Sequence, residues 1–323
     1  MTWFEELCGC AEDSPEQVRS VLSMRGTRLH SSCNGGSWEC GQLETPTLGE
    51  LRTAARTDTA HTEAGQMLKI REIKGDVREL HQDPANAGAL FQVASQFNLL
   101  EMTAPERTPE LGVGIYEYDP TQGPACAISA GAGTIYRNYF VPVNGEPGQS
   151  AHNQIDCLSD IGLLLGNQNG ELWQMKNGYA LPSADGLTLI AEHLHSLDEK
   201  GHDRVRQALR IGLQWETQVT LSGCSHRVSQ AYCSALPVAY AYHSAALWEP
   251  FAQLVLDAAY EATVCAGILN SRRTGNPTLY LTHLGGGAFG NEPAWIESAL
   301  NRALSLYPEA GIDVVLVRFG GGR

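Results

Sequence analysis

The chain has 323 residues, of which 43% are hydrophobic, and it carries a formal net charge of −14 at pH 7. This length is enough for one large domain or two moderate ones with a substantial core. The negative charge argues against non-specific binding to nucleic acid, whose phosphates it would repel, but it does not exclude a small anion held by backbone groups. A basic partner or an arginine-bearing protein substrate fits this charge, although the charge can also serve solubility alone.

Nine cysteines are present, an odd number, and several lie in apolar runs. The first residues lack the basic region and apolar core of a secretory signal, and no stretch approaches the ~20 apolar residues of a membrane span. We therefore expect a cytoplasmic protein with reduced thiols and no membrane association. No metal site is expected, because the common two-residue gap of zinc ligands is missing among Cys8, Cys10, Cys33 and Cys40.

Residues 1–65 are predicted to form an N-terminal elaboration packed on the core, with a helix that begins at the N-cap Ser14. Residues 66–323 are predicted to form the main domain. Its first strand, 68–73, alternates as a half-buried strand does, and it leads into Gly75, Asp76 and Val77.

A second apolar run, 89–98, predicts a buried strand that delivers Asn98 to a ligand crevice at its carboxyl end. The segment 99–133 that follows reads mostly as a long loop, and loops of that length tend to be functional or disordered. Aromatic and acidic residues interleave in it, which argues against disorder. Its acidic residues include Glu101, Glu117 and Asp119.

Strands and helices continue to alternate to the end of the chain, which predicts an α/β fold with a mixed or parallel sheet covered by helices. Strands are predicted over 136–141, 215–219, 228–237, 278–284 and 314–319, and helices over 154–161 and 248–269. On the long helix 248–269, three acidic residues lie off the apolar face and are expected to be solvated: Glu249, Asp257 and Glu261.

A glycine-rich loop follows the strand at 278–284, and a helix begins after it. Asn291 can cap that helix, and Pro293 fits its first turn. A strand, a bare glycine loop and a helix N-terminus together make a place for a phosphate, although glycine loops that bind nothing are also common. The loop consists of Gly285, Gly286, Gly287, Ala288, Phe289, Gly290 and Asn291.

The order of these motifs resembles the macrodomain family, which binds ADP-ribose. Macrodomains open with a strand and Gly-Asp-Ile, continue to Asn-Ala-Ala-Asn, and later present a glycine-rich phosphate loop. Here Gly75-Asp76-Val77 stands at the first place, Asn98 keeps the last residue of the second, and 285–291 is similar to the third. The resemblance covers roughly 67–320 and implies a three-layer α/β/α fold with a central mixed sheet.

The resemblance has departures. No triple glycine follows Asn98, and the Gly-Gly-Gly…Gln-Glu-Glu pattern of poly(ADP-ribose) glycohydrolases is absent. The larger size and the acidic loop look more like the divergent macrodomain hydrolases of bacterial effectors, which remove ADP-ribose from an arginine of ubiquitin.

The resemblance implies roles for individual residues. Asp76, with Val77, would accept a hydrogen bond from the adenine amino group, or Asp76 is simply a helix cap. Asn98 would bind a ribose, or it is a turn residue at a strand end. The loop 285–291 would wrap the diphosphate, and Phe289 would pack on a ribose or base, or in the core.

Removal of ADP-ribose from a side chain is a glycosidic cleavage with an oxocarbenium-like transition state, which a carboxylate can stabilise. We expect Asp119 to be catalytic, with Glu117 on the same face of an extended segment and Glu101 as the next candidate. Alternatively, all three are solvated loop charges.

The leading hypothesis is therefore a monomeric ADP-ribosylhydrolase that acts on ADP-ribosylated protein or on a small molecule and needs no cofactor. The alternatives are a module that reads ADP-ribose without cleaving it and a protein of the same fold that binds another nucleotide.

Overall fold

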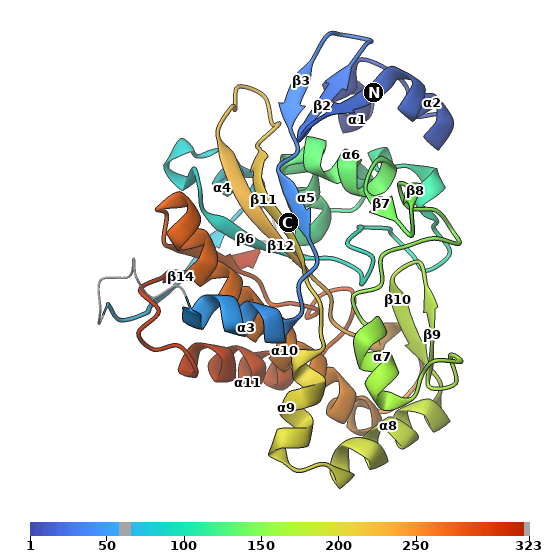
Figure 1. The fold of residues 1–323 in the computed structure, drawn as a ribbon, viewed down its shortest axis with the longest axis vertical. Helices are drawn as coiled ribbons and strands as arrows, with labels where there is room; N and C mark the ends of the chain where they lie inside the picture. The colour runs from blue at the N-terminus through green and yellow to red at the C-terminus, as the bar shows by residue number, and fades with distance from the viewer. Residues whose placement is uncertain (58–65, 320–323) are drawn as a thin grey trace.

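The computed structural model of the protein describes residues 1–57 and 66–319, and its centre is a seven-stranded mixed sheet (Figure 1). The strand order is β4-β11-β12-β6-β13-β14-β5, with bounds Gln42–Glu44, Gly212–Gln218, Arg227–Cys233, Leu90–Ala94, Thr278–Leu281, Asp313–Phe319 and Lys69–Gly75. The five strands from β12 to β5 are parallel, whereas β11 runs antiparallel to both of its neighbours. The carboxyl ends of five strands therefore meet at one edge of the sheet.

Helices cover both faces of this sheet (Figure 1). On β6, the side chain of Gln92 bonds Thr263 of α10 (Ala245–Thr274), whereas the ring of Phe91 stacks on His81 of α4 (Val77–Gln82). Successive side chains of a strand point to opposite faces, so α10 and α4 lie on opposite sides. The predicted three-layer α/β/α arrangement with a mixed central sheet is confirmed.

Six other helices lie on the α10 side or the α4 side of the sheet. Packed with α10 are α3, α8, α9 and α11, with bounds Leu48–Thr57, Ala184–Ser196, Glu199–Gln207 and Pro293–Ser305. On the side of α4 lie α5 (Gln122–Ser129), which contacts α4 and β6, and α6 (Gly131–Tyr139), which contacts β11. The smaller elements are α7 (Ser159–Leu165) and two hairpins, β7-β8 (Pro142–Val143, Glu146–Pro147) and β9-β10 (Trp173–Lys176, Tyr179–Pro182).

The 30-residue α10 is the central core helix. It contains a window with a mean hydropathy of 1.3, so by length and composition it could cross a membrane, whereas no stretch of this kind was expected. In the fold, 89% of this window is buried inside the protein. Helices α3, α8, α9 and α11 surround it, so it is apolar on most sides rather than on one face.

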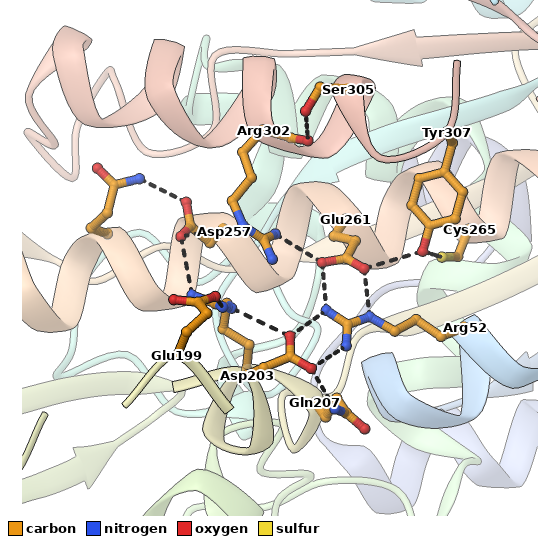
Figure 2. A network of polar contacts seen from close by, with 12 residues as sticks. Arg52, Glu199, Asp203, Gln207, Asp257, Glu261, Cys265, Arg302, Ser305 and Tyr307 are labelled. Atoms are coloured by element: carbon orange, nitrogen blue, oxygen red, sulfur yellow. Dashed lines mark hydrogen bonds and ion pairs between the residues drawn. The ribbon is translucent and has the colours of Figure 1, made fainter. Parts of the chain in front are cut away.

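Three acidic residues of α10 were expected to be solvated, and that expectation is wrong for Asp257 and Glu261. Both are buried, because α3, α9 and α11 cover this side of α10 (Figure 2). Glu261 accepts hydrogen bonds from Arg52 of α3 at 2.5 and 2.7 Å and from Arg302 of α11 at 2.8 Å. Burial favours a raised pKa for Glu261, but the hydrogen bonds from these arginines lower it below its usual value. Glu249 is exposed, as expected.

The N-terminal segment contains α1 (Trp3–Cys8), α2 (Pro15–Val21) and a three-stranded sheet of β1, β2 and β3 (Leu22–Arg25, Arg28–Ser31, Ser37–Glu39). The predicted helix start is confirmed, because Ser14 Oγ accepts the Gln17 N–H. Farther along, β4 joins the central sheet and α3 packs on α10. The boundary expected near residue 65 remains a prediction, since 58–65 lie outside the described residues.

Two expected elements differ. Residues 136–141 were predicted as a strand, but α6 extends to Tyr139, and the buried Arg137 donates to Leu99 O from this helix. Packing has overridden the strand preference of the aromatic residues. The helix predicted over 154–161 begins only at Ser159, because Asp156 Oδ1 accepts the Leu158 N–H in a turn before it.

Candidate active site

A cavity of about 1050 Å³ lies beyond the carboxyl ends of the parallel strands. Ala94, Thr282 and Val317 line it near the ends of β6, β13 and β14, and much of the glycine-rich loop forms another part of its wall. This is where open α/β sheets bind ligands, and the volume is at the upper end of small-molecule sites.

The cavity opens where β6 and β13 separate. The two strands pair only at Leu90 with Leu279 and at Phe91 with Tyr280. Beyond that point, the Gln122 amide accepts the Ala94 N–H at 3.1 Å and donates to Gln92 O at 2.8 Å. A side-chain amide thus satisfies backbone groups that a continued strand would have paired.

Glu101 lines this cavity and is 3% exposed. Its Oε1 atom has no hydrogen-bond partner in the described structure. Burial raises the pKa of Glu101 well above its usual value; the charge of Arg137 opposes this shift, and that of Asp119 adds to it. The side chain therefore keeps its proton to a higher pH than an exposed glutamate does.

Gly123, in the first turn of α5, is needed for this arrangement. A Cβ atom there would lie 2.0 Å from Ala94 O and 2.4 Å from Glu101 Oε2. The absence of a side chain lets α5 begin directly beside the Glu101 carboxyl group. Three further residues of this helix start line the cavity: Thr121, Gln122 and Pro124.

Asp119 also lines the cavity and is half-buried. It follows the 3-10 helix η4 (Gly114–Tyr118), and its Oδ1 accepts the Thr121 N–H at 2.9 Å. This turn holds its carboxylate between η4 and α5. The structure therefore brings two of the three candidate carboxyl groups, Glu101 and Asp119, into one cavity.

Glu117 has a different position. Its Oε2 accepts the Trp3 N–H at 2.8 Å, and it is not among the residues that line the cavity. The expectation that Glu117 and Asp119 share one face is wrong, because Gly114–Tyr118 is helical rather than extended.

The glycine-rich loop lies at the cavity as expected, with Gly285, Gly286, Gly287, Ala288 and Phe289 in its wall. Gly285 and Gly290 have φ of +74° and +69°, values that favour glycine. The expected capping role of Asn291 is wrong, since Glu292 occupies the N-cap of α11. The Asn291 amide instead donates to Leu236 O at 2.8 Å and to Gly285 O at 3.3 Å, which closes the loop. Pro293 does lie in the first turn of α11.

The remaining candidate residues are not among those that line the cavity. Asp76 caps α4, where its Oδ1 accepts the Arg78 N–H at 2.8 Å, and Val77 is buried. Asn98 is also buried: its amide donates to Gln154 Oε1, and its Oδ1 accepts the Leu100 N–H. Their ligand-binding roles remain predictions.

Three aromatic rings meet at the cavity wall, and of these only Phe289 was a candidate site residue. Phe289 lies with its ring centre 5.4 Å from Tyr179 and 5.7 Å from Tyr240. Tyr179 donates to Met102 O at 2.7 Å, next to Glu101. The turn before Tyr179 was visible as Asn177-Gly178, but no sequence signal placed this hairpin beside the glycine-rich loop.

No protein-family model matches the sequence, and neither does any curated protein. The comparison with solved structures finds matches at low identity. The poly(ADP-ribose) glycohydrolase of Thermomonospora curvata is 12% identical, with a TM-score of 0.46 over 94% of this chain and 90% of that chain. A complex of that enzyme with the inhibitor ADP-HPD is 12% identical, with a TM-score of 0.45 over 94% of this chain and 90% of that chain. The poly(ADP-ribose) glycohydrolase of Deinococcus radiodurans in complex with ADP-ribose is 12% identical, with a TM-score of 0.44 over 87% of this chain and 88% of that chain. All three TM-scores lie below 0.5.

Proposed function

We propose that this protein is an ADP-ribosylhydrolase that binds ADP-ribose in the cavity and cleaves the glycosidic bond to a protein side chain. The observation that supports it is the shared cavity of a buried, unpartnered Glu101, a half-buried Asp119 and the glycine-rich loop. Glycosidic cleavage uses such a pair of carboxyl groups in different protonation states.

In the proposed reaction, the two carboxyl groups have separate roles. Glu101, which holds its proton, donates it to the leaving atom of the side chain as the bond to the anomeric carbon breaks. Asp119 stabilises the positive charge that develops on the ribose and accepts a proton from the water that adds there. The products are free ADP-ribose and the restored side chain.

The glycine-rich loop binds the diphosphate in this proposal. Its backbone is uncovered at Gly286 and Gly287, which are exposed to the cavity. Backbone N–H groups of such a loop can donate to phosphate oxygens, and the start of α5 adds a second group of N–H donors.

We further propose that the side chain from which ADP-ribose is removed is an arginine. Four carboxyl-bearing residues line the cavity together with Arg318: Glu72, Glu101, Asp119 and Glu297. Glu72 is paired with Arg318 and Glu101 holds its proton, so Asp119 and Glu297 are the carboxylates that suit a guanidinium leaving group. We also propose that the substrate is an ADP-ribosylated protein and that the enzyme acts in the cytoplasm.

The decisive experiment combines binding and release. Calorimetry with ADP-ribose tests binding, and mass spectrometry follows release from arginine-, glutamate- and serine-linked ADP-ribosylated proteins. We expect Glu101→Gln and Asp119→Asn to bind ADP-ribose within a few-fold of wild type but to lose roughly 100-fold or more in release rate. Glu249→Gln, an exposed site on α10, is the matched control.

The possible outcomes separate the hypotheses. No binding of submillimolar ADP-ribose would overturn the proposal entirely. Binding without release from any of the three linkages would indicate a reader module. Release that survives both carboxyl substitutions would overturn the assignment of Glu101 and Asp119.

A further inference from the structure

Glu12, between α1 and α2, reaches the segment that carries Asp119. Its Oε1 accepts the Val113 N–H at 2.8 Å and the Tyr139 hydroxyl at 2.8 Å, and its Oε2 accepts the Gly114 N–H at 2.7 Å. A carboxylate that accepts several hydrogen bonds in a partly buried place fixes its donors strongly. The start of η4 is thereby tied to the N-terminal segment.

Two glycines in this segment are explained by Glu12. A Cβ atom on Gly112 would lie 2.5 Å from the Glu12 carboxyl group, and one on Gly114 would lie 2.8 Å from Glu12 Oε2. The Gly112-x-Gly114 pair therefore makes room for a carboxylate of this same chain. No ligand is needed to account for it.

Trp3 of the N-terminal segment bonds residues near both ends of η4. The Trp3 N–H donates to Glu117 Oε2 at 2.8 Å, and the Trp3 indole N–H donates to Val113 O at 2.9 Å. Trp3 and Glu12 thus connect the N-terminal segment to η4, whose Glu117 accepts one of these bonds.

From η4, two contacts lead to the candidate catalytic groups. Tyr116, in η4, is fully buried, and its hydroxyl accepts the Glu101 N–H at 3.0 Å. Asp119 follows directly, and its N–H donates to Tyr116 O at 3.2 Å. A shift of η4 would therefore move Asp119 and release the backbone of Glu101.

We propose that Glu12 is a positioning residue for the carboxyl pair, which it holds in place through η4. This inference rests on the proposed hydrolase function and extends it to a segment that carries none of the cavity-lining residues. Misplacement of a reacting group by about 1 Å can cost ~100-fold in rate, so the effect should appear in kcat rather than in ligand binding.

The test uses Glu12→Ala and Glu12→Gln in the full chain, with Glu16→Ala on α2 as the control. We expect Glu12→Ala to lower kcat about 10- to 100-fold with KM and ADP-ribose affinity within about twofold of wild type. Glu12→Gln keeps an acceptor oxygen for one N–H and should lose less. Glu16 is exposed except for its contact with Arg19, so its variant should match wild type.

A double-mutant cycle separates positioning from general damage. If Glu12 acts through the carboxyl pair, Glu12→Ala should lower the rate little further in a protein that already carries Glu101→Gln and Asp119→Asn. Independent losses that multiply, or a fall in kcat matched by an equal fall in ADP-ribose affinity, would overturn the inference.

A second readout does not depend on turnover. The carboxyl carbon of Glu101, followed by NMR titration, should show a lower pKa in Glu12→Ala than in wild type, because a displaced η4 admits water to Glu101. If wild type releases no ADP-ribose, the proposed function fails, and this titration still decides the positioning role. An unchanged Glu101 titration in folded Glu12→Ala would overturn it.

Discussion

At the scale of single residues, Glu101 is a candidate catalytic group whose burial disfavours its ionised form. A buried carboxyl group with an unpartnered oxygen is unfavourable when ionised, which is why its pKa is raised. The folded protein holds this proton more tightly than the unfolded chain does. The stabilisation from the proton is complete below the unfolded pKa, near ~4.3, and is lost as the pH rises through the folded value.

Because the pKa of Glu101 is raised in the folded protein, Glu101→Gln should change how stability depends on pH. The neutral amide cannot ionise, so the variant should gain stability relative to wild type as the pH rises above the unfolded pKa of a glutamate. Urea unfolding at several pH values measures this difference, and the same variant should be inactive in release. Parallel stability curves for the two proteins would show that Glu101 ionises freely in the fold.

Gly287 allows a test of the loop without harm to the fold. Among the described residues, a Cβ atom at Gly287 would meet nothing within 4 Å, and the φ of Gly287 is not in the left-handed region. If the loop wraps a diphosphate, however, a methyl group there obstructs the ligand. We expect Gly287→Ala to weaken ADP-ribose binding about tenfold or more in calorimetry, with an unchanged Tm.

Gly49→Ala is the matched control, since Gly49 lies in α3 and a Cβ there would make ordinary contacts of 3.4 Å or more. Wild-type affinity in both alanine variants would argue that the loop binds no phosphate.

At the scale of elements, the buried ion pairs connect α3 to the core (Figure 2). Arg52 donates to both Glu261 of α10 and Asp203 of α9, and Arg302 of α11 reaches the same Glu261. Removal of one partner from such a group leaves a buried charge with too few hydrogen bonds.

We therefore expect Arg52→Met to lower the free energy of unfolding by about 3 kcal/mol. The control is Lys69→Met, which breaks an exposed pair with Asp313 at 3.5 Å and should cost less than ~1 kcal/mol. Chemical denaturation of both variants measures this contrast. Equal losses would mean that burial of the Arg52 contacts adds nothing.

At the scale of the whole molecule, the net charge of −14 opposes an anionic ligand. Salt screens this repulsion, so association with ADP-ribose should become several-fold faster between about 20 and 300 mM NaCl. Stopped-flow measurements of the association rate test this. The opposite trend would indicate that local positive charge, such as Arg318, dominates the approach to the cavity.

Much of the architecture was readable from the sequence because it depends on local patterns. The apolar runs of β6, β12, β13 and β14 and the long helix α10 were visible as predicted. So was the glycine-rich loop after β13, where only a bare backbone suits the φ of Gly285 and Gly290. The elements that were misread, α6 and the start of α7, have local preferences that tertiary contacts override.

In the candidate site, too, local sequence patterns predicted some features and tertiary contacts decided the others. By itself, the sequence determined that an acidic segment and a glycine loop exist in an α/β protein. Only the tertiary structure decided that Asp119 and Glu101 share the cavity with that loop, while Glu117 bonds Trp3 instead. The physical reason is that residues distant in sequence, such as Gly123, pack against Glu101, and the burial that results raises its pKa against the opposing charge of Arg137. No local pattern encodes these contacts.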